Sequence, residues 1–296
     1  MKNLTSTFKI VFIVCIALFL LGLIVSCIFG INTFATLGNG QQLVYQVNGE
    51  KDDYSTEINA VKSFLKENGA KVVLVQTSYN AFDKVDSLIF TFKANENLDA
   101  NVVVSGNQCQ VSDINSKQAT RTVGVAAIAL GVALVLVFGY MALRHLKNNW
   151  MAYSLGCVCT ILLNCLAIFG IVQLAGLFGY QFDASIVGTF MFVMILTVVT
   201  FILTTSFARY SVDFKKVSMF DGLQSANKTL GVYYWIFAIV VAVVAVVLSI
   251  IFGGAFAIKL VPIAVASLVC ALTAVTVAPA LWYLFSNKEE QTNTGK

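Results

Sequence analysis

The chain has 296 residues, of which 58% are hydrophobic and only 11% are charged, and its mean hydropathy is +0.82. Soluble domains carry roughly 25% charged residues, so this composition excludes an ordinary soluble globular protein. The formal net charge of +4 is small and its bases are not clustered, which argues against a nucleic-acid partner. Long blocks of the sequence carry no charge at all, which is typical of helices that span a bilayer.

Six apolar runs are long enough to cross a hydrocarbon core about 30 Å thick. The first run is longer than the apolar region of a cleavable signal peptide. It also has no clear cleavage site around Ser26, Cys27 and Gly30, so we expect it to remain as an anchor. The predicted spans are residues 10–30, 123–143, 151–178, 184–207, 232–252 and 260–285.

Lysines and arginines gather in the connections on one side of the predicted spans. By the positive-inside rule that side is cytoplasmic, so we expect a multi-pass protein of the cell membrane with both termini in the cytoplasm. On the opposite side, the connection at 178–183 has no base and the one at 253–259 has only Lys259. The bases on the cytoplasmic side are Lys2, Lys9, Arg144, Lys147, Arg209, Lys215, Lys216 and Lys228.

Residues 31–120 form the one stretch that is polar and long enough to fold in water, and this topology puts them outside the cytoplasm. The apolar patterns predict the order β-α-β-β, with Gly69 ending the helix. One helix on one small sheet is the layout of half a ferredoxin-like unit, a small α+β fold. The predicted elements are a strand at 42–47, a helix at 56–68, strands at 71–76 and 87–93, and a short fourth strand at 102–104.

The predicted organisation therefore has four parts. Residues 1–30 carry a short cytoplasmic N-terminus and the first span, and residues 31–120 form the extracytoplasmic domain. Residues 121–285 contain spans two to six, and residues 286–296 form a cytoplasmic tail.

No motif in the chain indicates catalysis, a cofactor or a metal. The H-E-x-x-H, G-x-S-x-G and P-loop patterns are missing, and the single histidine, His145, lies in a basic connection. Cys109 is the one cysteine of the 31–120 domain, so no disulfide forms within it. The other cysteines lie in predicted spans and are interpreted as small packing residues. We therefore do not expect an enzyme.

Polar side chains at membrane depth are few, and each has two interpretations. Asp183, at the outer end of the fourth span, is either a helix N-terminal acid or a carboxylate at the mouth of a proton or ion path. Thr197, Thr200 and Thr204 share one helix face and either line that path or pack against other helices. Arg209 is either a topology anchor or a cytoplasmic gate. Two polar residues of the third span, Asn164 and Gln173, are expected to bond to a neighbouring helix.

Three segments in the C-terminal half follow the pattern of a known family. They are FGYQFDASIVGTFMFVMILTVV at 178–199, FDGLQSANKTLG at 220–231 and SIIFGGAFAIKLVPIAVASLVCALTAVTVAPALWYL at 249–284. Together they resemble the C-terminal half of SecF, an accessory subunit of the bacterial Sec protein translocase in the resistance-nodulation-division superfamily. The positions that match the family's motifs are 182–183, 227–230, 252–254 and 278–279.

The fourth span departs from that family. The stretch ILTVVT at 195–200, which has no aspartate, stands where SecF-like proteins carry a polar segment with an aspartate. Arg209 alone matches a cluster of acids and arginines at the cytoplasmic end of the span. The resemblance thus leaves open whether the proton step belongs to this chain or to a SecD-like partner with intramembrane carboxylates of its own.

The resemblance implies a subunit that uses the proton or ion motive force to help draw unfolded secretory polypeptides across the membrane. A SecD-like subunit and the Sec translocon channel would be its partners, within the lipid bilayer. The alternatives are a membrane scaffold without transport activity, whose outer domain binds a partner, and another transporter of the same superfamily. The expected site residues are Asp183, Thr197, Thr200 and Thr204 in the ion path, Arg209 at the cytoplasmic gate, and Gly253 and Gly254 in an outer turn.

Overall fold

The structure is a computed structural model, and it divides into two compact units. One unit is Thr33–Gly124, an α+β domain, and the other joins Met1–Asn32 to Val125–Lys296, a helical bundle. The residues that the structure describes are 2–29, 40–47, 53–80, 85–94, 98–114, 116–146, 149–178, 180, 185–252 and 254–293.

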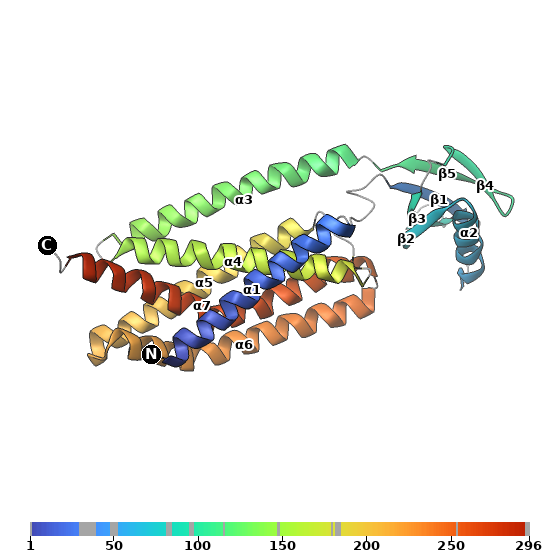
Figure 1. The fold of residues 1–296 in the computed structure, drawn as a ribbon. Coiled ribbons are helices and arrows are strands. Elements are labelled where there is room, and N and C mark those ends of the chain that lie inside the picture. Colours follow the sequence, from blue (N-terminus) through green and yellow to red (C-terminus); the bar gives the residue numbers. More distant parts are fainter. Residues whose placement is uncertain are drawn as a thin grey trace. The chain divides into compact units, whose positions relative to one another are not determined.

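The α+β domain consists of a five-stranded antiparallel sheet and one helix (Figure 1). The sheet order is β2-β3-β1-β5-β4. Because β3 is antiparallel to both β1 and β2, those two strands are parallel and α2 connects them, which is a split β-α-β arrangement. The elements are β1 (Gln41–Val47), α2 (Ser55–Glu67), β2 (Ala70–Asn80), β3 (Val85–Ala94), β4 (Asn101–Val104) and β5 (Asn107–Asp113).

The core of this domain lies between the sheet and α2. Leu43 on the central strand β1 pairs with Phe90 of β3 on one side and Val111 of β5 on the other, and all three side chains are buried. Val61 and Leu65, one turn apart on α2, cover them. The expected helix, strands and short fourth strand are confirmed, although β2 and β3 are longer than expected.

The fifth strand, β5, was not predicted from the sequence. Its sequence NQCQVSD has only two apolar side chains, Cys109 and Val111, and these are the two that point into the core. A two-residue turn at Ser105 and Gly106 connects it to β4, and both turn residues have positive φ, 51° and 83°. This is the turn geometry that suits the twist of a hairpin, so the pairing of β4 and β5 is set locally.

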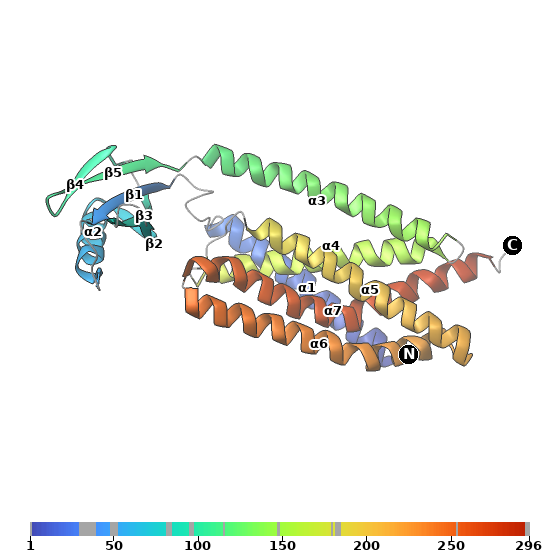
Figure 2. The same ribbon diagram turned by 180° about the vertical axis from the view of Figure 1, so that it is seen from behind.

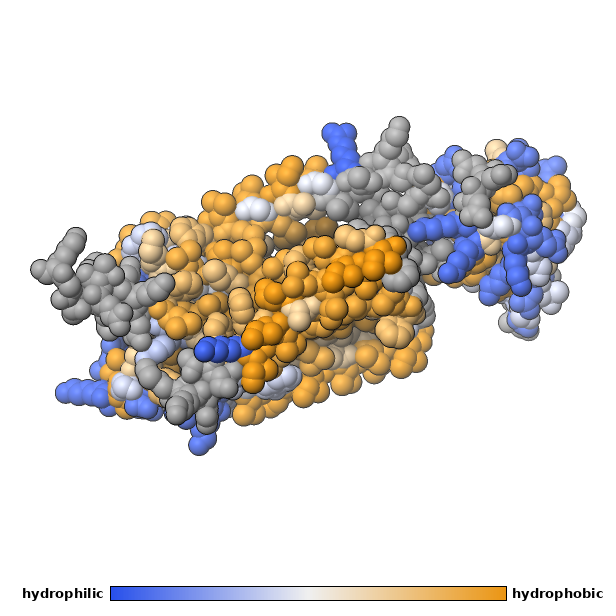
Figure 3. Space-filling model, viewed as in Figure 1, coloured by the Kyte–Doolittle hydropathy of each residue, from blue (hydrophilic) through white to orange (hydrophobic). Residues whose placement is uncertain are grey.

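The bundle contains six described helices long and apolar enough to cross a membrane. This confirms the predicted fold class, a multi-pass helical membrane protein with a small α+β domain between the first two spans. Hydrophobic side chains cover the bundle broadly (Figure 3). The helices are α1 (Lys2–Phe29), α3 (Ser116–Arg144), α4 (Trp150–Gly176), α5 (Ile186–Lys215), α6 (Met219–Phe252) and α7 (Gly254–Asn293).

Helix α6 begins far before the apolar run expected at 232–252. Its first turns are amphipathic, and Leu223 and Ala226 are buried against the end of α5 around Ala208. Packing of that apolar stripe stabilises a helix where hydropathy alone predicts a connection. Helices α4 and α7 form the buried centre of the bundle, and both are 56% buried in their most apolar windows, against 6% for α3 and 17% for α6.

Candidate functional site

The threonines of α5 lie on the side of the helix that packs against other helices. Thr197, Thr200 and Thr204 are 2%, 5% and 1% exposed. Spacings of three and four residues place side chains on one face of a helix, and here that face is buried. The three hydroxyls nevertheless make different bonds.

Thr197 takes part in a polar contact between three helices. The Asn164 Nδ2 group of α4 donates to the Thr197 Oγ1 atom at 2.9 Å, and Cys270 Sγ of α7 lies 3.7 Å from both atoms. All three side chains are buried, and the Asn164 Oδ1 atom has no hydrogen-bond partner among the described residues. The expected bond from Asn164 to a neighbouring helix is confirmed.

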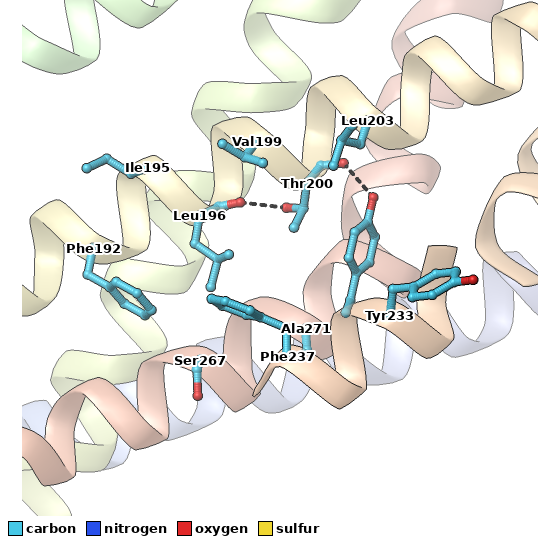
Figure 4. Close-up of a pocket in the computed structure, with 11 residues that line it drawn as sticks. Phe192, Ile195, Leu196, Val199, Thr200, Leu203, Tyr233, Phe237, Ser267 and Ala271 are labelled. Carbon is cyan, nitrogen blue, oxygen red and sulfur yellow. Dashed lines mark hydrogen bonds between the residues drawn. The ribbon is translucent and has the colours of Figure 1, made fainter. Parts of the chain in front are cut away.

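Thr200 and Thr204 connect α5 to Tyr234 of α6. The Tyr234 hydroxyl donates to the Thr200 backbone oxygen at 3.1 Å and lies 2.9 Å from the Thr204 Oγ1 atom. The Thr200 hydroxyl donates within its own helix, to the carbonyl oxygens of Leu196 at 2.9 Å and Thr197 at 3.1 Å. Figure 4 shows the bond between Thr200 and Leu196. These hydroxyls therefore tie helices together and satisfy carbonyl groups.

An apolar groove of about 430 Å³ lies beside this contact, between α5 and α6 and above α7 (Figure 4). Ile195, Val199 and Leu203 form its α5 wall, and Phe237 faces them from α6. The surface that the groove exposes is almost entirely apolar, so it suits an acyl chain or an apolar helix better than an ion.

Arg209 lies elsewhere, at the end of the bundle where α4 begins and α5 and α7 end (Figure 1 and Figure 2). The Arg209 Nε atom is 3.6 Å from the Asp213 Oδ2 atom, and both side chains are partly exposed. Beside them is a second pocket, of about 310 Å³, which Tyr153 and Trp282 also line. The Tyr153 ring contacts the Trp282 ring at 5.3 Å.

His145 stacks on the Tyr153 ring, with ring centroids 3.7 Å apart and planes 7° from parallel. Burial, Arg144 and Arg209 each lower the pKa of His145 below its ordinary value. The imidazole is therefore neutral at pH 7, because both its surroundings and its neighbours oppose a further positive charge. Stability from this group is present above the unfolded pKa of about 6.5 and declines as the pH falls through the lower folded value.

Several expected site residues are not brought together. Asp183 and Gly253 lie outside the described residues, so the ion-path role of Asp183 and the outer turn stay predictions. Gly254 is the first residue of α7. Arg209 and Thr197 lie three turns apart along α5, so the gate and the threonine face are separate features. Among the described residues, no three side chains of histidine, cysteine, aspartate or glutamate gather in a way that could hold a metal.

Sequence reasoning missed the contact between α1 and α4. A Cβ atom added to Gly170 would lie 2.4 Å from the Leu18 backbone oxygen, and one added to Gly22 would lie 2.6 Å from the Gly170 Cα atom. The two helices therefore touch backbone to backbone, as small residues permit in membranes. The Ser26 hydroxyl donates to Gln173 Oε1 at 3.1 Å in the same contact, which confirms the expected partner helix for Gln173. Gly22 and Gly170, each within an apolar span, are the sequence signal that could have indicated this contact.

No protein-family model matches the sequence, and no curated protein matches it. The structure is similar to a crystal structure of SecDF in its super-membrane-facing form, with a TM-score of 0.72 and 14% sequence identity. The match covers 99% of this chain and 40% of that chain, so this chain spans less than half the length of the solved protein. The chain therefore has a SecDF-like fold over its whole length.

Proposed function

We propose that this chain is a SecF-like subunit of the protein export machinery, which helps secreted polypeptides across the cell membrane. The observation that carries the proposal is the SecDF-like fold over 99% of the chain, with the α+β domain in the chain between the first two spans. The three C-terminal segments that resemble SecF support it independently, because they are matches of sequence. An enzymatic role has no support from any motif.

A SecD-like partner follows from the extent of the match. The chain accounts for 40% of the solved SecDF chain, and transporters of this architecture usually form their path between two repeats. The apolar groove on α5 and α6 is a surface that a helix of such a partner would fill, since Ile195, Val199 and Leu203 are 65%, 47% and 47% exposed. The Sec channel and the emerging unfolded polypeptide complete the proposed assembly.

The proposed use of the ion gradient depends on Asp183, because residues 186–208 contain no ionisable side chain. In this proposal Asp183 and acids of the partner carry the ion, while Thr197, Thr200 and Thr204 hold α5 against its neighbours. Arg209 marks the cytoplasmic end, and the basic residues near it support cytoplasmic termini.

A non-transporting scaffold is the second candidate, and the absence of ionisable side chains from residues 186–208 favours it. A span without charged groups needs no water-filled path and can anchor the α+β domain by packing alone. In that role the α+β domain would bind a partner, and Asp183 would be a helix N-terminal acid with no part in export.

One experiment separates the two candidates. Tagged chain is purified from its native membrane in mild detergent, and export of a secreted reporter is followed in cells that carry Asp183→Asn or the matched control Asp99→Asn, which changes an exposed acid of the α+β domain. Recovery of a SecD-like subunit and the channel, with slower export in Asp183→Asn only, is the expected result. Recovery with normal export would leave a SecF-like subunit whose ion step lies in the partner. Failure to recover any translocase component would contradict the SecF-like assignment and favour the scaffold.

A further inference from the structure

The pocket beside Arg209 has buried polar atoms that no described residue satisfies. The Ser286 Oγ and Asn149 Oδ1 atoms are buried without a hydrogen-bond partner among the described residues, and both side chains line the pocket. The Trp282 and Arg209 side chains, which also line it, are each hydrogen-bonded to the Tyr153 hydroxyl. Buried polar atoms almost always have a partner, so an unsatisfied hydroxyl and an unsatisfied amide oxygen in one pocket indicate a ligand that both accepts and donates hydrogen bonds.

One cationic side chain, Arg209, and one carboxylate, Asp213, also line the pocket. Arg209 contributes a guanidinium whose described ion pair, with Asp213, is long and partly exposed, and pairs of this kind are weak. The N-terminus of α4 opens onto the pocket through Asn149 and Tyr153, and its first turn has no side-chain cap. A guanidinium and the positive end of a 27-residue helix together favour an anion.

Acceptor groups in the same pocket restrict the chemical class of the ligand further. The Asn149 Nδ2 group donates to the Ser286 backbone oxygen at 3.3 Å, which leaves the Asn149 Oδ1 atom buried without a partner. The Asp213 carboxylate also lines the pocket. A bare anion would satisfy only the donors, whereas an anion that carries hydroxyl groups would satisfy Asn149 and Asp213 as well.

The surroundings of the pocket are those of a membrane surface. Val212 and Met219 give it an apolar edge, and the exposed rings of Tyr210 and Phe214 pack together at 4.6 Å on the same end of α5. Aromatic rings at helix ends are typical of headgroup depth, and basic pockets between spans bind lipid headgroups. Lys215 and Lys216 follow immediately in the sequence.

We propose that this pocket binds the phosphate diester of an anionic phospholipid with headgroup hydroxyls, such as phosphatidylglycerol, in the leaflet at the Arg209 end of the bundle. Arg209 and Ser286 donate to the phosphate oxygens, and Asn149 and Asp213 accept from the headgroup hydroxyls. The site is independent of the export function, and it assigns Arg209 to lipid recognition.

The test measures lipid binding to the full purified chain by native mass spectrometry and by the shift of its melting temperature. Phosphatidylglycerol is compared with diacylglycerol, which lacks the phosphate, and with glycerol phosphate, which lacks the acyl chains. We expect one phosphatidylglycerol to bind and to raise the melting temperature, with no shift from diacylglycerol. An equal shift of the melting temperature by glycerol phosphate would overturn the proposal that the ligand is a lipid. The ligand would then be a free phosphate ester.

Arg209→Ala and Ser286→Ala are each expected to weaken phosphatidylglycerol binding by about tenfold, as expected for the loss of a charge-assisted bond. Lys215→Ala is the matched control, because it removes the same charge from the same helix end but lies outside the pocket lining. Equal weakening by Lys215→Ala would mean unspecific attraction and would overturn the site. Ser286→Ala adds a second readout: stability without lipid should stay unchanged, whereas a purely structural hydroxyl would lower it.

Discussion

Helices α4 and α6 have almost the same hydropathy and opposite surroundings. Their most apolar windows score 2.5 and 2.9, yet 56% of the first is buried and only 17% of the second. The buried side of α4 contains Gly156, Thr160, Asn164 and Gly170, whereas the exposed side of α6 is mainly valine and isoleucine. In a bilayer, apolar character does not distinguish inside from outside, because lipid tails are as apolar as leucine. Small and polar residues mark the interior.

The largest expected effect is that of Gly170→Leu. The side chain would overlap the Leu18 backbone, so α1 and α4 would have to separate, and we expect a loss of at least about 3 kcal/mol or failure to fold. The measurement is the melting temperature of the purified protein. Gly131→Leu in α3, where an added Cβ meets nothing within 4 Å, is the control and should behave as wild type. Equal damage from both would contradict the close contact.

Asn164→Ala should have a smaller effect than Gly170→Leu. It removes the bond to Thr197 from the centre of the bundle, and we expect a loss of about 1 kcal/mol. Equilibrium unfolding in mixed micelles measures it, and a double-mutant cycle with Thr197→Val isolates the pair. Ser249→Ala in α6 removes a hydroxyl that bonds only to its own helix, at the Ala245 oxygen, and should change stability little. Additive losses at Asn164 and Thr197 would argue against a coupled contact.

Tyr234→Phe tests a buried polar contact of α6, the kind of contact that characterises α4. The hydroxyl bonds both the Thr200 backbone oxygen and Thr204, so its removal should cost about 0.6 kcal/mol, near the mean for bonds between membrane helices. The neighbouring Tyr233→Phe removes the same atom from a side chain that is 65% exposed. The same unfolding assay compares the two, and a loss at Tyr233 as large as that at Tyr234 would count against the assignment.

The smallest effect is expected on the lipid side of α6. Val243→Ala should change the free energy of unfolding by less than about 0.5 kcal/mol, since the valine is 56% exposed and lipid replaces its contacts. Ile161→Ala in α4 removes a fully buried side chain and should cost about 2 kcal/mol or more. Similar losses at the two positions would erase the difference between the helices.

Much of the fold could be predicted from the sequence because its signals are local. Hydropathy located the six spans, and the apolar spacing with Gly69 located α2, whose following glycine has φ of +68°. Strand β5 was missed because it has only two inward apolar residues, and the early start of α6 was missed because its stability comes from packing on α5.

Only part of the site could be predicted, because only part of it depends on local sequence signals. Helical spacing is enough to place Thr197, Thr200 and Thr204 on one face, but not to show that Asn164 and Cys270 come from two other helices to meet Thr197. Arg209 was singled out by its charge. The buried polar atoms of Ser286 and Asn149 beside it depend on how the start of α4 meets the ends of α5 and α7, which no local pattern encodes.

The absence of charge along residues 186–208 of α5 has an electrical consequence. A charge that crosses the membrane potential contributes about 2.3 kcal/mol per 100 mV, and residues 186–208 have no charge to contribute. Sliding or tilting of that segment across the bilayer therefore performs no work against the voltage. Any voltage dependence of a process in which this segment moves must come from ions that cross beside it or from charged groups outside it, such as Arg209 at the end of the same helix.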